Sequence, residues 1–171
     1  MKQTKLKTFA VVSACMMGML SSSAQGVMQR TANYHPDGRG FSCVNGNNRY
    51  TRALYGSVDE WRLETSDRPI FAIFKKNNHR NIRFLIKCNG QAFQLDSVEY
   101  CRARYEAGKR EYLMKDKRWG SGVLKLSVLA YPQTEGAVWK FVAENFGKAK
   151  IEIVGMICET RVSKFKRAGD I

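Results

Sequence analysis

Apolar and polar residues alternate along most of the chain after residue 40. The run from Ile82 to Cys88 is apolar at every second position, with Arg83 and Lys87 among the intervening residues. A period of two is typical of a β-strand with one buried face. The same alternation recurs in three later runs, at 124–130, 137–143 and 151–157. These runs therefore predict half-buried strands.

Turn-forming residues separate the strand-like runs. Asn and Gly tolerate the positive φ of tight turns, and Pro fixes φ at a value that suits them. The clusters are Asn77-Asn78, Asn89-Gly90, Ala107-Gly108, Gly120-Ser121-Gly122, Pro132 to Gly136 and Asn145 to Gly147. The best helical candidate, Val138 to Phe146, is bounded by glycines and fits a strand as well. The pattern therefore predicts an all-β fold, an antiparallel β-sandwich.

The N-terminus has the order of segments found in a secretory signal peptide. Three lysines precede an apolar run, Phe9 to Leu20, which ends in the small residues 21–24. The run is too short to span a bilayer comfortably, so we expect cleavage after Ala24 and a periplasmic or secreted protein. Acylation at Cys15 as a lipoprotein is the alternative, but the apolar run continues beyond that cysteine, which favours ordinary cleavage.

The rest of the chain divides into three predicted parts. Residues 25–39 carry few apolar side chains and are expected to form an extended lead-in. Residues 40–160 are predicted to form the β-sandwich domain. Residues 161–171 are basic and polar, so they are either a tail or the truncated start of a linker.

The chain is strongly basic. It has 29 Lys and Arg against 15 Asp and Glu, a formal charge of +14, and the mature chain would still carry about +11. Outside the cytoplasm such a charge favours acidic glycans, although basic residues scattered along strands usually form only a solvated surface. No nucleic-acid-binding motif accompanies the charge, so no nucleic-acid partner is expected.

The cysteines and histidines predict no metal site and no cofactor. Four cysteines remain after the leader, and in an oxidising compartment they allow three disulfide pairings. All of them lie in apolar runs, so free buried thiols are favoured over a disulfide pair. The two histidines lie far apart in loop-like sequence, which argues against zinc. These residues are Cys43, Cys88, Cys101, Cys158, His35 and His79.

No catalytic constellation stands out in the sequence. Glycoside hydrolysis needs a pair of carboxylates, which could be drawn from Glu64, Asp67, Asp96 or Glu99, but acidic residues on strands are usually solvated. We therefore expect that the chain alone is not a complete enzyme.

Aromatic residues offer the better functional lead. Trp119 follows Arg118 in a polar turn, where its ring could stack on a pyranose or fold back as a lid on the sandwich edge. Trp61 suits either role, and Trp139 alternates with core residues and is expected to be buried.

Three motifs resemble a known family. The segments Asn48 to Gly56, Arg62-Leu63-Glu64 and Asp67-Arg68-Pro69 look like the N-terminal part of an uncharacterised family of secreted Bacteroidota proteins. Those longer proteins resemble six-hairpin glycosidases, with a β-sandwich, a linker and an (α/α)6 barrel. The likeness covers roughly 38–169 and includes the turn with Arg118 and Trp119.

The resemblance implies an accessory, super-sandwich-like domain of a glycoside hydrolase-like protein that acts on polysaccharide. The catalytic acids would lie on the barrel, so no catalytic residue carries over to this chain. The residues predicted to bind carbohydrate or to contact the barrel are Arg49, Arg52, Trp61, Arg68, Arg118 and Trp119.

The alternative is a free-standing carbohydrate-binding module for acidic glycans. Arg52, Arg62 and Arg68 would then bind carboxylate or sulfate with both prongs of the guanidinium group. These arginines could instead pair with Glu64 and Asp67 and contribute only local order.

Overall fold

The computed structural model of the chain describes residues 33–47, 50–56, 61–75 and 78–159. The predicted signal peptide, the predicted tail and Arg49 lie outside these ranges. Within them strands are the main secondary structure, and helix is almost absent. The strands are His35–Asp37 (β1), Gly40–Val44 (β2), Tyr50–Tyr55 (β3), Trp61–Ser66 (β4), Phe71–Lys75 (β5), Asn78–Cys88 (β6), Gln91–Gln94 (β7), Tyr100–Glu106 (β8), Lys109–Lys115 (β9), Val123–Ala130 (β10), Ala137–Glu144 (β11) and Ile151–Glu159 (β12). Two short 3-10 helices, Leu95–Ser97 (η1) and Lys117–Trp119 (η2), interrupt them.

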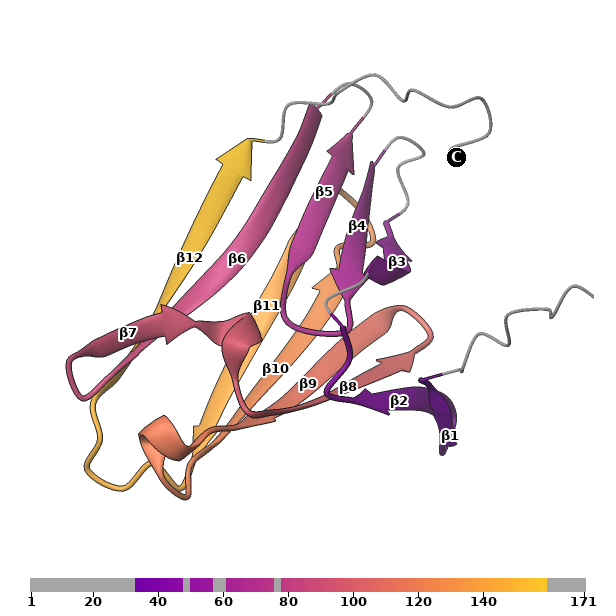
Figure 1. Cartoon of the computed structure of the whole chain (residues 1–171). Coiled ribbons are helices and arrows are strands. Elements are labelled where there is room, and N and C mark those ends of the chain that lie inside the picture. The colour runs from indigo at the N-terminus through magenta and orange to yellow at the C-terminus, as the bar shows by residue number, and fades with distance from the viewer. Residues whose placement is uncertain (1–32, 48–49, 57–60, 76–77, 160–171) are drawn as a thin grey trace, which may run out of the picture. The chain divides into compact units, whose positions relative to one another are not determined.

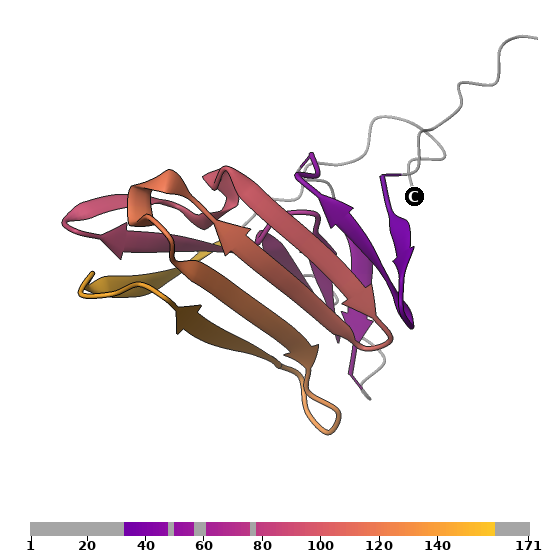
Figure 2. The ribbon, with the colours of Figure 1, turned by 90° about the horizontal axis from the view of Figure 1, so that it is seen from below.

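The strands form two antiparallel sheets (Figure 1). Sheet A has the order β1-β2-β8-β9-β10-β11. Sheet B has the order β12-β6-β5-β4-β3, and β7 pairs with the second half of β6. Figure 2 shows the two sheets as separate layers. The all-β fold and the antiparallel sandwich are confirmed.

The core lies between the sheets, where the alternation predicted it. Phe71 of sheet B meets Tyr112 and Trp139 of sheet A edge to face, with ring centroids 5.8 and 5.9 Å apart. Phe84 and Phe141 make a second such contact at 5.1 Å. The predicted inward positions of β6 and β10 are buried, and they are Ile82, Phe84, Ile86, Cys88, Leu124, Leu126 and Val128.

The predicted turn at Asn89-Gly90 joins β6 to β7. Both residues have positive φ, 50° and 83°. Two consecutive residues in this region characterise the tight hairpin turn whose twist matches the flanking strands. The sequence cluster therefore marked both the position and the conformation of this turn.

Two burial predictions need correction. The four cysteines are free, as predicted, but only three are buried, because Cys158 lies on edge strand β12 and is exposed. Trp139 is only partly buried, because β11 is the edge strand of sheet A and one side of the ring has no neighbouring strand to cover it. The strand β1 begins at His35, inside the stretch predicted as a lead-in.

Candidate functional site

The described residues among those predicted for the site do not all meet at one place, although Arg68 and Arg118 both donate to backbone carbonyls of residues 96–98. Arg68 follows β4, in the loop that leads to β5. Its Nε donates to the carbonyl of Gly46 at 3.0 Å, and its Nη1 donates to those of Asp96 and Val98 at 3.0 and 2.8 Å. Arg68 thus joins its own loop to two other segments through their backbone carbonyls, so its contacts stabilise the fold.

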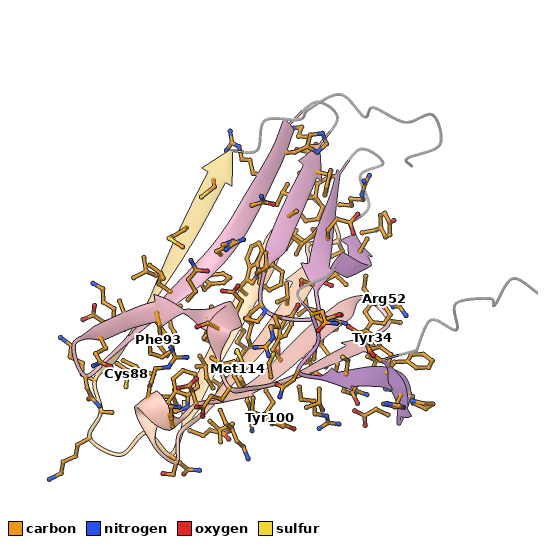
Figure 3. The ribbon with its side chains drawn as sticks, viewed as in Figure 1. Tyr34, Arg52, Cys88, Phe93, Tyr100 and Met114 are labelled. Atoms are coloured by element: carbon orange, nitrogen blue, oxygen red, sulfur yellow. The ribbon has the colours of Figure 1, made fainter. Side chains whose placement is uncertain are left out.

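Arg52 and Tyr34 lie beside each other at one end of the sandwich (Figure 3). The Arg52 guanidinium lies 5.6 Å from the centroids of both the Tyr34 and the Tyr105 rings. These distances are within the range of cation–π attraction. Arg52 is nonetheless exposed to solvent. A ligand could therefore reach this arginine of the predicted site.

A buried polar network lies next to this end. The Arg110 side chain is fully buried, and its Nη2 donates to the Ser66 carbonyl at 2.9 Å and lies 3.6 Å from an oxygen of Asp67. The Tyr34 hydroxyl accepts from Arg110 and donates to Asp67. The Tyr112 hydroxyl donates to the same Ser66 carbonyl at 2.7 Å, and burial raises the pKa of Tyr112. This network joins Tyr34, which precedes β1, to the end of β4 and to β9.

Trp119 is buried. Of the two positions considered from the sequence, its ring takes the one in which it folds back over the edge of the sandwich. Its ring stacks on Phe93 at 5.8 Å and contacts Phe146 at 5.7 Å. Its Nε1 donates to the Gly122 carbonyl at 3.0 Å. With both sides of the ring against other aromatic side chains, no face is open to a sugar.

Arg118 is held by the same turn. Its guanidinium lies 3.5 Å from the Phe93 ring centroid and donates to Asp116 at 2.6 Å. Burial alone would raise the pKa of Asp116, but the hydrogen bonds from Arg118 and from backbone N–H groups prevail and lower it to about 2. This carboxylate therefore stays ionised at neutral pH, which does not suit a general acid.

Trp61 and Arg62 have structural contacts as well. Trp61 is buried in the core on the inner face of β4. Arg62 lies 4.5 Å from the Phe74 ring centroid and forms an ion pair with Glu64 at 2.7 Å. The sequence offered the alternative that these arginines pair with neighbouring acidic residues, and Arg62 and Glu64 form such a pair.

The structure reveals a groove that the sequence prediction missed. It has a volume of about 190 Å³ on the outer face of sheet A, across β8, β9 and β10. Its lining residues are Arg102, Arg104, Glu111, Tyr112, Leu113, Lys125, Leu126 and Ser127.

Each of the three cations that line this groove is paired with an acidic neighbour, and the partner of Arg102 is Asp37. Arg104 bonds Glu106 and Glu111 at 2.7 and 3.1 Å, and Lys125 bonds Glu144 at 2.8 Å. The hydrogen bond to Glu106 raises the pKa of Arg104, against a smaller desolvation effect. The groove is thus a polar surface with more basic than acidic side chains along its walls.

One sequence signal could have found the groove. Arg102 and Arg104 are two residues apart on a strand, so both side chains lie on one face. The other side of the groove comes from strands later in the chain, and their alignment is visible only once the sheet order is known.

The buried thiols are not suited to nucleophilic chemistry. Burial raises the pKa of Cys101 to about 12 and also raises that of Cys43. A thiol must be deprotonated to act as a nucleophile or a metal ligand. Among residues 33–159, leaving aside the gaps in that range, no group of His, Cys, Asp and Glu is arranged to hold a metal ion. The described residues also contain no helix with the length and apolar character needed to cross a membrane.

Comparison with known proteins identifies the C-terminal half of the chain. Residues 78–171 match the model of DUF4450, a domain of unknown function. The match includes β6 to β12, and with them the groove and the turn of Trp119, but not the motifs at 48–69. No curated protein and no solved structure matches the chain. Because the match covers more than half of its residues, the chain, whose own fold is β-rich, belongs to the DUF4450 family, a domain family of unknown function.

Proposed function

We propose that this chain is the accessory β-sandwich domain of a secreted glycoside hydrolase-like protein that acts on polysaccharide. The resemblance of the motifs at 48–69 to six-hairpin glycosidase-like proteins of Bacteroidota suggests this role. In such a protein the catalytic acids belong to an (α/α)6 barrel, and the sandwich supports the barrel.

The supporting observation is an exposed apolar patch on the outer face of sheet A. Leu129 of β10 and Val138 of β11 are directly paired and are 45% and 49% exposed. Val142 lies on the same face of β11 and is 38% exposed. We call these three residues the β10–β11 patch. Leu129 and Val138 are adjacent, whereas Lys140 lies between Val138 and Val142 on this face. Adjacent apolar residues exposed on one face are typical of a surface that packs against another domain.

Two measurements test the accessory role. The purified chain should release no reducing sugar from any of a panel of polysaccharides, because the barrel would supply the catalytic acids. The reading frame or gene that follows should encode a helical-hairpin domain. When that domain is co-expressed with the chain, Val138→Lys should weaken their association. Hydrolysis by the chain alone, or association that is insensitive to Val138→Lys, would contradict the proposal.

A second candidate function is the binding of acidic glycans, and the groove favours it. Arg102, Arg104 and Lys125 line it, and guanidinium groups bind a carboxylate through two parallel hydrogen bonds. Leu113 adds an apolar surface between them, against which a sugar ring could lie. Arg68 is less suited to this role, because its guanidinium donates to backbone carbonyls.

Affinity electrophoresis in polygalacturonate and in a neutral dextran tests this candidate. Polygalacturonate alone should retard the protein, and the effect should fall from low salt to about 0.15 M because charge attraction is screened over about 8 Å there. Lys125→Gln should reduce it. Lys87→Gln is the matched control, because Lys87 is also in a surface ion pair with a glutamate but lies on sheet B. Equal effects of the two variants would mean that only net charge matters.

A further inference from the structure

The strand β12 ends sheet B with one side unpaired. It pairs along its full length with β6, so on its other side alternate backbone N–H and C=O groups have no neighbouring strand in the described part of the chain. In Figure 1 it is the yellow strand at the border of the sheet. An edge of this kind is a ready template for another strand.

Proteins usually protect such edges, and the other edge strands of the described part of the chain show the usual devices. β7 has only four residues. β1 is three residues long and contains Pro36. β11 carries Lys140 at its middle, and β3 has an irregular register between Tyr50 and Arg52. β12 carries charges only near its ends, at Glu152 and Glu159, and the six residues between them, Ile153 to Cys158, are uncharged and contain no proline.

Side chains on both faces of β12 are also uncovered. Ile157 pairs with buried Ile82, so it lies on the inner face of sheet B, yet it is 65% exposed. Val154 lies on the opposite face and is 36% exposed. An added strand would satisfy the backbone groups and cover both side chains at once.

We propose that the partner is a second copy of this chain, with the two β12 strands antiparallel about a two-fold axis at Gly155. This register places Ile153 opposite the partner's Ile157, and Val154 opposite the partner's Met156. Such apolar cross-strand pairs stabilise a sheet. Glu152 faces the partner's Cys158, so like charges do not meet.

The surface is self-complementary, as a two-fold interface requires. It differs from the β10–β11 patch, which lies on the other sheet, so this inference stands apart from the proposed accessory role. It also predicts that the dimer is not a disulfide dimer, because Cys158 does not face itself.

Sedimentation velocity of the purified protein tests the proposal. We expect the mass of two chains at tens of micromolar, with or without reducing agent. Ile157→Lys should give the monomer mass, because it places a charge at an apolar cross-strand pair while the exposed position leaves the fold intact. Val138→Lys on β11 is the matched control and should remain dimeric. A monomeric wild type, or equal behaviour of the two variants, would overturn the proposal.

Disulfide trapping tests the register independently. In a Cys158→Ser background, Gly155→Cys should form a covalent dimer under mild oxidation, because position 155 faces itself across the axis. An added Cβ there would lie 3.4 Å from the Phe84 ring, an ordinary contact, so the substitution should fold. Ile153→Cys should not form the dimer, since it faces Ile157 of the partner subunit. Trapping at 153 instead of 155 would overturn the register.

Discussion

Arg110 shows how one residue can hold distant segments together. A buried cation is costly unless it is paired and hydrogen-bonded. Arg110 meets Asp67, Ser66 and Tyr34, but its Nε and Nη1 have no hydrogen-bond partner among the described residues. Its hydrogen bonding is therefore incomplete, and the contacts that it does make matter more.

Replacing Arg110 should be strongly destabilising. Arg110→Ala removes a buried ion pair and two hydrogen bonds and leaves a cavity, so we expect a loss of about 3–5 kcal/mol in the free energy of unfolding. Urea denaturation measures it as a lower midpoint at constant slope. Arg83→Ala, which removes an exposed hydrogen bond to Gln94, should cost below about 0.5 kcal/mol. Similar losses for the two variants would mean that the network does not stabilise the fold.

Asp116 should make stability depend on pH in the acid range. Its folded pKa of about 2 is below the ordinary value of 3.8, so its contribution is present above pH 4 and is lost as pH falls toward 2. Arg118 is partly exposed, so screening limits the contribution to about 1–2 kcal/mol. Urea unfolding from pH 2 to 6 should show Asp116→Asn less stable than wild type at pH 6 and nearly equal at pH 2. A constant difference across this range would contradict the assignment.

At the scale of elements, the turn around η2 covers one end of the sandwich core. Trp119 fills the space between Phe93, next to η1, and Phe146, beyond β11. Its indole N–H is satisfied within the turn, by Gly122. The turn is therefore part of the core, although its sequence is polar.

Trp119→Ala should consequently reduce stability and leave glycan binding unchanged. Removal of a buried tryptophan ring costs about 3–5 kcal/mol, which differential scanning calorimetry would detect as a lower melting temperature. Retardation in polygalacturonate should equal that of wild type at a temperature where the variant is folded. Loss of binding with an unchanged melting temperature would instead identify Trp119 as a ligand-stacking residue.

Strands and turns could be predicted from the sequence where the residues of the element itself determine its structure. Apolar residues alternate with other residues from Ile82 to Cys88, which predicts a strand with one buried face. The Asn89-Gly90 pair tolerates positive φ, which predicts the turn. The structure shows both. The exposure of Cys158 and the burial of Trp119 depend on which strands lie at an edge and which distant rings come close. The groove likewise depends on sheet order. Contacts between residues far apart in sequence leave no local signal.

At the scale of the whole molecule, the two sheets share one core. Phe71 lies at its centre and contacts Phe84 within sheet B, and Tyr112 and Trp139 of sheet A. Each edge-to-face pair adds about 0.5–1.5 kcal/mol beyond the burial of area. Because one side chain bridges both layers, neither sheet can lose its partner without exposing a large part of its own buried face.

We therefore expect the two sheets to unfold together. Phe71→Ala should lower the free energy of unfolding by about 3–5 kcal/mol, and it should do so equally for probes on both sheets. Variants in which phenylalanine replaces the other two tryptophans keep an aromatic ring at each core position, and the remaining Trp61 on sheet B or Trp139 on sheet A provides the fluorescence probe. Their urea transitions should coincide, as all-or-none unfolding requires, and Phe71→Ala should shift them by the same amount. Val138→Ala, at an exposed position of β11, controls for a general effect of shortening an apolar side chain. Separate transitions, or a shift seen by only one tryptophan, would show that each sheet has a stability of its own.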